Sequence, residues 1–106
     1  MPYYQMISVP QAYRLLHGPY GTRILDVRDS WAYEEGHIPG AVHVPMAQVG
    51  YRVPRLMPGR QRPILIYCQG GGKSRVAAQV LAVLGYRKLY CIDGFPRPLF
   101  GSAAGN

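Results

Sequence analysis

The sequence predicts an α/β fold built around a mostly parallel sheet. Short apolar segments typical of strands alternate along the chain with segments that have the apolar spacing of helices, and this alternation is typical of parallel sheets. The segment at residues 63–67 is almost continuously apolar, as expected of a central strand that is buried on both faces. The chain has 106 residues, which is close to the commonest size of a single domain.

The first half of the chain holds three of the expected strands and two helices. Ser8 and Gln11 have the spacing of a capping box, so a helix is expected to begin after Ser8. It should stop at Gly18 and Pro19, because neither residue favours a helix interior. The other elements expected here are strands at residues 4–7, 23–27 and 41–44, and a short helix at residues 31–35 that Asp29 or Ser30 caps and Gly36 ends.

The second half of the chain continues the alternation. Between residues 75 and 84 the apolar side chains recur at helical spacing, which predicts a helix that ends at Gly85. Before the central strand we expect a weak helix at residues 46–52 and a loop at 55–63. After the helix we expect a last strand at residues 88–92, followed by a tail with three apolar anchors, Phe95, Leu99 and Phe100.

One domain is expected over residues 1–106, with residues 1–5 and 101–106 frayed. No long uncharged apolar stretch is present, so a membrane span is not expected. The N-terminus lacks the pattern of a signal peptide, which favours a cytoplasmic location. Two cysteines are too few for a disulfide framework or a four-cysteine metal site.

Basic residues are concentrated in the second half of the chain. The net charge is +7, and residues 54–106 hold eight of the twelve basic residues but one of the five acidic ones. Such a charge attracts small anions and acidic protein surfaces, although it also serves solubility. Nucleic acid is not favoured as a partner, because the basic residues are scattered and no nucleic-acid-binding motif is present.

The most informative segment follows the central strand. Cys68 begins a glycine loop that runs into a predicted helix. Backbone N–H groups in such a loop can converge on one point, and the helix N-terminus and nearby cations also favour the thiolate, which is the reactive form of cysteine. The segment therefore predicts an anion-binding loop with a nucleophile at its entrance. The candidate site residues are Cys68, Gln69, Gly70, Gly71, Gly72, Lys73, Ser74 and Arg75.

Five other residues are considered as candidates. Asp26 and Arg28 alternate along the end of a strand and are expected on one face. A functional role would be to brace the Cys68 loop or to contact a substrate, but we favour a structural salt bridge or loop hydrogen bonds. His37 is expected to fix a turn by hydrogen bonding. Cys91 lies in the middle of the last strand and is interpreted as a core residue. Trp31 is interpreted as a core anchor of its short helix.

Three blocks of the sequence together closely resemble rhodanese domains. The Cys68 loop is similar to the active-site loop of that family, commonly Cys-x-x-Gly-x-Arg-Ser, and Asp93-Gly94-Phe95 is similar to its late glycine motif. The order and spacing of the blocks match from about residue 6 to residue 100. The first block consists of Leu25-Asp26-Val27-Arg28, Tyr33, Gly36-His37-Ile38-Pro39-Gly40-Ala41 and Val44-Pro45.

The resemblance implies a rhodanese-like fold, with a five-stranded, mostly parallel sheet flanked by helices on both faces. It also implies a sulfurtransferase of the thiosulfate:cyanide type, in which Cys68 carries sulfur as a persulfide. Two positions depart from the family pattern. Lys73 stands where arginine is common, and it keeps the charge without the fork that binds an oxyanion through two hydrogen bonds. Phe95 stands where a second glycine is usual.

The chemistry expected from this resemblance has two half-reactions. Cys68 takes the outer sulfur of thiosulfate or a similar small anionic donor, and sulfite leaves. The persulfide lies among the N–H groups of residues 69–74, while Lys73 and Arg75 hold the anionic end of the donor. Cyanide, a thiol or a protein then accepts the sulfur, and neither a metal nor an organic cofactor is needed.

Two alternatives remain open from the sequence. One is a non-enzymatic module that carries sulfur or binds a partner, because such a module can share the same loop. The other is an enzyme of the phosphatase or arsenate reductase type, whose sites resemble Cys-x5-Arg. That spacing from Cys68 leads to Ser74, with Lys73 one position earlier and Arg75 one later, so it fits this chain poorly.

Overall fold

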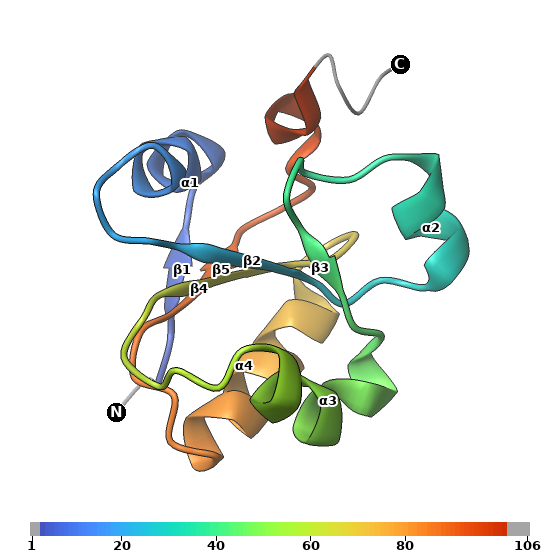
Figure 1. Cartoon of the computed structure of the whole chain (residues 1–106). Coiled ribbons are helices and arrows are strands. Elements are labelled where there is room, and N and C mark those ends of the chain that lie inside the picture. Colours follow the sequence, from blue (N-terminus) through green and yellow to red (C-terminus); the bar gives the residue numbers. More distant parts are fainter. Residues whose placement is uncertain (1–2, 102–106) are drawn as a thin grey trace.

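The computed structural model describes residues 3–101 and has a single five-stranded sheet at its centre (Figure 1). The strand order is β1-β5-β4-β2-β3, and every neighbouring pair is parallel. The predicted α/β fold with a parallel sheet is therefore confirmed. The strands are β1 (Gln5–Ile7), β2 (Arg23–Asp26), β3 (Val42–His43), β4 (Ile64–Tyr67) and β5 (Leu89–Ile92).

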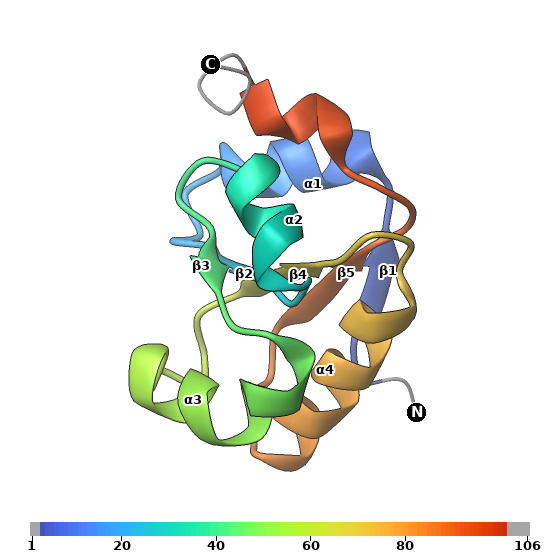
Figure 2. The ribbon, with the colours of Figure 1, turned by 90° about the vertical axis from the view of Figure 1, so that its right-hand side faces the viewer.

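Helices cover both faces of the sheet. Figures 1 and 2 show α3 and α4 against one face, and α1, α2 and the short turn η2 on the other. The side chains of β4 alternate between two cores, because Ile64 and Ile66 pack on the α3 and α4 side while Leu65 and Tyr67 pack on the other. The helical elements are α1 (Val9–Leu16), α2 (Ser30–Glu35), η1 (Met46–Gln48), α3 (Val49–Leu56), α4 (Gly72–Val83) and η2 (Arg97–Phe100).

Helix α1 begins with the predicted capping box. The Ser8 hydroxyl oxygen accepts a hydrogen bond from the Gln11 N–H at 3.2 Å, and the Gln11 side-chain oxygen accepts one from the Ser8 N–H at 2.8 Å. Two N–H groups that the helix cannot satisfy internally are thus paired. The expected start of this helix is confirmed.

Helix α3 was placed incorrectly from the sequence. We expected a weak helix to end at residue 52 and a loop from residue 55, but the helix continues to Leu56 with Pro54 inside it. Val49, Val53 and Met57 recur every four residues and are buried. Their packing compensates for the hydrogen bond that proline cannot donate. Helix α4 likewise begins at Gly72, three residues before the predicted start.

The two ends of the chain were expected to be frayed. Gln5 instead begins β1 and pairs with Tyr90 of β5. The remainder of that expectation, for residues 1–2 and 102–106, lies outside the described residues. Within residues 3–101, no helix has the length and apolar character needed to cross a membrane.

Candidate active site

Cys68 lies where the central strand of the sheet ends. It directly follows β4, which pairs with β2 on one side and β5 on the other. Its side chain is only 2% exposed and packs with the core on the α3 and α4 side. The carboxyl ends of parallel strands are the usual place for ligand sites in α/β folds. The position of Cys68 therefore fits a site that is reached through a cavity, and not a thiol on the open surface.

Two backbone N–H groups point at the sulfur of Cys68. The N–H of Gly71 lies 3.0 Å from Sγ, and the N–H of Ser74 lies 3.4 Å from it. Ser74 is the third residue of α4, so the sulfur lies at the N-terminus of a 12-residue helix. Both N–H groups and the helix dipole favour negative charge at this point.

The shape of the loop depends on Gly71, which precedes the first residue of α4. Its φ of +100° lies in the left-handed region that favours glycine. A Cβ added there would lie 3.9 Å from the Ile92 carbonyl oxygen, so the backbone conformation disfavours a side chain more than space does. The Ser74 hydroxyl donates a hydrogen bond to the Gly71 carbonyl at 2.9 Å, which holds the turn against the helix start.

The two cations of the loop have different positions. Lys73 lines the cavity above Cys68 and pairs with Asp29 at 3.6 Å, with both side chains more than half exposed. Arg75 is exposed on α4 and lines neither of the two cavities at the site. The structure thus brings Lys73 to the site but does not support the expectation that Arg75 holds the donor there.

Asp26 and Arg28 form a buried ion pair beside the loop. The Arg28 Nη2 donates to Asp26 Oδ2 at 2.7 Å, and its Nε donates to both carboxylate oxygens at 3.0 and 3.1 Å. The exposed fractions are 0% for Asp26 and 4% for Arg28. Burial opposes the charge of Arg28, but the hydrogen bonds and charge of Asp26 outweigh it and raise the pKa of Arg28. The ion pair expected between Asp26 and Arg28 is therefore present.

Arg28 also joins the segments that surround the site. Its Nη2 donates to the Gly36 carbonyl at the end of α2 at 2.6 Å. Its guanidinium lies 5.4–5.8 Å from the ring centres of Tyr67, Phe95 and Phe100, a distance typical of cation–π contacts. Arg28 therefore connects β2, α2, β4 and the tail after β5.

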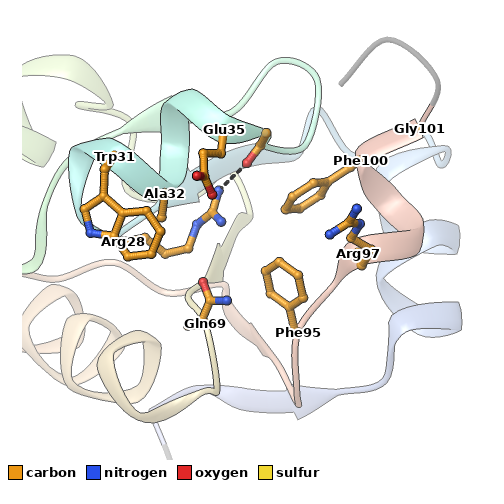
Figure 3. A pocket seen from close by; sticks show the side chains of 10 residues that line it. Arg28, Trp31, Ala32, Glu35, Gln69, Phe95, Arg97, Phe100 and Gly101 are labelled. Carbon is orange, nitrogen blue, oxygen red and sulfur yellow. Dashed lines mark hydrogen bonds between the residues drawn. The ribbon is translucent and has the colours of Figure 1, made fainter. Parts of the chain in front are cut away.

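Two cavities open next to each other at this end of the sheet. The first, which we call the Cys68 cavity, has a volume of about 370 Å³ and is lined by Cys68, Gln69, Gly70, Gly72 and Lys73 together with Arg28 and residues 29, 31 and 32. The second, which we call the α2–η2 cavity, has a volume of about 500 Å³. Figure 3 shows that it lies between α2, Gln69 and the tail from Phe95 to Gly101.

Several residues that line these cavities were not predicted as site residues, among them Trp31, Phe95, Arg97 and Phe100. Trp31 was interpreted as a core anchor, but its side chain is 63% exposed and lines both cavities. Helix α2 turns the neighbouring Ala32 toward the protein instead, with 6% exposure. Phe95, Arg97 and Phe100 line the α2–η2 cavity. The motif at Asp93-Gly94-Phe95 and the apolar anchors marked this tail, but the sequence did not indicate which elements it meets.

Cys91 and His37 have the positions expected for structural residues. The Cys91 side chain is fully buried, and its thiol donates a hydrogen bond to the Ser74 carbonyl at 3.4 Å. Burial raises the pKa of Cys91 to about 12, so the thiol is neutral at physiological pH. His37 Nδ1 lies 2.7 Å from the Tyr33 carbonyl, and its ring stacks on Tyr33, which fixes the turn after α2.

Comparison with known proteins identifies the family. A model of the rhodanese-like domain matches residues 8–95. The chain belongs to the rhodanese family. Within residues 3–101, no group of three or more histidine, cysteine, aspartate or glutamate side chains could hold a metal ion.

Three relatives illustrate the relationship. The candidate sulfur carrier protein YrkF of Bacillus subtilis is 39% identical over 66 residues, which are 62% of this chain and 35% of that protein. The structure of a thiosulfate sulfurtransferase from Pseudomonas aeruginosa is 28% identical, with a TM-score of 0.75 over 98% of this chain and 19% of that one. The human single-domain sulfurtransferase TSTD1 is 24% identical and shares the fold, with a TM-score of 0.73 over 92% and 93% of the two chains.

The chain spans about a third of the length of YrkF, one of the curated relatives that it matches. At the level of the family, sulfur transfer is the function that these matches support.

Proposed function

We propose that this rhodanese is a sulfurtransferase of the thiosulfate:cyanide type, in which Cys68 is the nucleophile that carries the sulfur. The observation that carries the proposal is the pairing of a buried Sγ with the N–H groups of Gly71 and Ser74 at the start of α4. A cysteine that served packing alone would not need a left-handed glycine and a helix N-terminus at its sulfur.

In the first half-reaction the Cys68 thiolate attacks the outer sulfur of thiosulfate. The new S–S bond forms as the bond between that sulfur and the sulfonate breaks, and sulfite leaves with the electron pair. The product, Cys68–S–S⁻, is anionic, so the loop N–H groups stabilise it as they stabilise the thiolate. Lys73, at the mouth of the Cys68 cavity, attracts the doubly charged donor.

In the second half-reaction an acceptor removes the outer sulfur. Cyanide takes it to give thiocyanate, and a thiol takes it to give a new persulfide, while Cys68 returns as a thiolate. Each step exchanges one bond to sulfur for another, so the cycle needs neither a metal nor an organic cofactor. A cytoplasmic setting suits the cycle, because thiols there stay reduced and both Cys68 and Cys91 are free.

A second candidate function is that of a sulfur carrier supplied by another protein. The similarity to the candidate sulfur carrier YrkF favours it. The persulfide on Cys68 would be the same, but a protein donor would load it much faster than thiosulfate does. Comparing the loading rates for the two kinds of donor distinguishes the functions.

The test is the intact mass of the purified protein after treatment with thiosulfate. We expect the protein to gain one sulfur atom and to lose it again when cyanide is added. Cys68→Ser should show no gain, and Cys91→Ser, the matched control at the other cysteine, should behave as the wild type. A gain that persists in Cys68→Ser would refute the assignment of the nucleophile, and no gain in the wild type would refute thiosulfate as the donor.

A further inference from the structure

We propose that the α2–η2 cavity is the acceptor subsite, and that it binds an organic thiol that carries a carboxylate. The inference rests on the proposed function, since it concerns the molecule that takes sulfur from Cys68. The residues that carry it are Arg97, Phe95 and Phe100 on the tail after β5, and Trp31 and Gln69 between the two cavities.

The first argument is that the two cavities are adjacent. Arg28, Trp31, Ala32 and Gln69 line both of them, so they form the boundary that the cavities share. Cys68 itself is 2% exposed. An acceptor must bring its sulfur into the Cys68 cavity while the rest of the molecule stays outside the loop. The α2–η2 cavity, with about 500 Å³ next to that point, has room for a small organic molecule.

The second argument is the chemistry of the walls. Phe95 and Phe100 meet edge to face with ring centres 5.3 Å apart and form an apolar wall for the carbon chain of the ligand. Arg28 lines the same cavity, but its charge is paired with Asp26, and its Nε and Nη2 are engaged by Asp26 and the Gly36 carbonyl. Arg97 is exposed and forms no ion pair among residues 3–101.

The charged side chains on the two sides of the cavity also orient the ligand. Figure 3 shows Glu35 on α2 and Arg97 on η2, at different sides of the cavity. A ligand carboxylate is repelled by Glu35 and attracted by Arg97, whose planar guanidinium suits a carboxylate. The carboxylate end therefore lies at η2, and the thiol end points past Gln69 toward Cys68.

The transfer step balances without a further reagent. The acceptor thiol R–SH gives its proton to the persulfide Cys68–S–S⁻, which yields R–S⁻ and Cys68–S–SH. The thiolate R–S⁻ then attacks the outer sulfur of Cys68–S–SH, and the bond between R–S and that sulfur forms as the bond to Cys68 Sγ breaks. The products are R–S–SH and the Cys68 thiolate. The electron pair of the broken bond stays on Sγ, where the Gly71 and Ser74 N–H groups receive it.

Binding can be measured apart from the reaction. Trp31 is the only tryptophan of the chain and lines both cavities, so its fluorescence reports on the site. The probe is methylthiopropionate, a thioether that cannot react, and its neutral counterpart is methylthiopropanol. We expect the carboxylate to bind about three- to fivefold more tightly than the alcohol, as an exposed ion pair allows. Arg97→Ala should remove this preference, and Arg97→Lys should restore part of it.

Arg87→Ala is the matched control. Arg87 is also exposed, and it lies just before β5, at the opposite end of the parallel strands from Cys68. Arg87→Ala should keep the preference for the carboxylate over the alcohol, which separates a local contact of Arg97 from the loss of one positive charge.

The reaction itself gives a second readout. Arg97→Ala should still gain sulfur from thiosulfate, but it should lose the preference for mercaptopropionate over mercaptoethanol as the acceptor, when the two rates are compared per thiolate.

The outcomes separate the two proposals. Equal affinity for the carboxylate and the alcohol, or an unchanged preference in Arg97→Ala, would overturn the acceptor subsite even if Cys68 gains sulfur. Arg97-dependent binding without any such preference in sulfur transfer would overturn the acceptor role of the cavity. Failure of the wild type to gain sulfur from thiosulfate would count against the proposed function, while the binding result would still decide whether the cavity binds carboxylates.

Discussion

Two cations near Cys68 show how strongly surroundings decide the role of a residue. Arg28 is buried, is held by the Asp26 carboxylate and contacts three aromatic rings. Lys73 is more than half exposed, and its 3.6 Å pair with Asp29 is open to water. A buried charge that loses its partner is costly, whereas an exposed pair contributes little. We therefore expect Arg28 to be structural and Lys73 to be adaptable.

This contrast predicts different costs for two similar substitutions. Asp26→Ala leaves the Arg28 guanidinium buried without its carboxylate, so the free energy of unfolding should fall by about 3–5 kcal/mol. Asp29→Ala removes the exposed partner of Lys73 and should cost about 0–1 kcal/mol. Urea unfolding of both variants measures the difference. Equal costs would show that the Asp26–Arg28 pair is no more important to stability than a surface contact.

The raised pKa of Cys91 predicts a loss of stability at high pH. Burial raises this pKa from 9.0 to about 12, so between these values the folded state keeps a proton that the unfolded state has released. Stability from this thiol is therefore complete below pH 9 and lost as the pH rises to about 12. When the free energy of unfolding is measured between pH 9 and 12, it should decline less steeply with pH in Cys91→Ser than in the wild type. If the free energy of unfolding declines equally in both proteins, groups other than Cys91 control the loss of stability at high pH.

At the scale of elements, the sequence predicted best where the decisive contacts are local. The capping box of Ser8 and Gln11 acts within one helical turn, and the apolar β4 is buried on both faces. Helix α3 was misjudged because the burial of Val49, Val53 and Met57 outweighs the effect of Pro54. In these cases the tertiary packing, which the sequence pattern does not contain, decided the boundary.

In the candidate site, too, the features that depend on neighbouring residues were easier to predict than those that depend on tertiary packing. The Cys68 loop could be predicted because its glycines, cations and helix start are consecutive in sequence. The α2–η2 cavity could not, because Trp31 and Arg97 meet across it from distant parts of the chain. The outward position of Trp31 depends on which face of the six-residue α2 meets the sheet. The helix is too short for its apolar spacing to show that face.

The loop between β4 and α4 depends on the conformation of one residue. Gly71→Ala puts a side chain at a φ of +100°, which costs about 1–2 kcal/mol or forces the turn to change. A changed turn moves the Gly71 N–H away from Sγ, so loading of Cys68 from thiosulfate should slow by roughly tenfold or more.

The neighbouring Gly70 supplies the control. No atom lies within 4 Å of a Cβ added at Gly70, and its φ is not in the left-handed region. Gly70→Ala should therefore keep the stability of the wild type in urea unfolding, and its loading rate, measured by the mass gain after thiosulfate, should fall much less than that of Gly71→Ala. If Gly70→Ala is as impaired as Gly71→Ala, crowding in the loop, and not the turn, controls the site.

At the scale of the whole molecule, the fold places the basic half of the chain around the site. The loop with Cys68, helix α4 and the tail with Arg97 all belong to residues 54–106, which carry the entire net charge of +7. A field of this sign raises the local concentration of small anions and speeds their association. The charge should therefore act on the rate at which thiosulfate arrives, in addition to any local contact at Lys73.

This field predicts a rate that depends on ionic strength. The second-order rate constant for loading Cys68 from thiosulfate should fall roughly three- to tenfold between about 10 mM and about 200 mM potassium chloride, because the added salt shortens the screening length. Alkylation of Cys68 by neutral iodoacetamide is the control, and its rate should change little over the same range. If both rates fall together, salt acts on the loop or on the Cys68 thiolate itself. If neither falls, the charge of +7 has no part in capturing the donor.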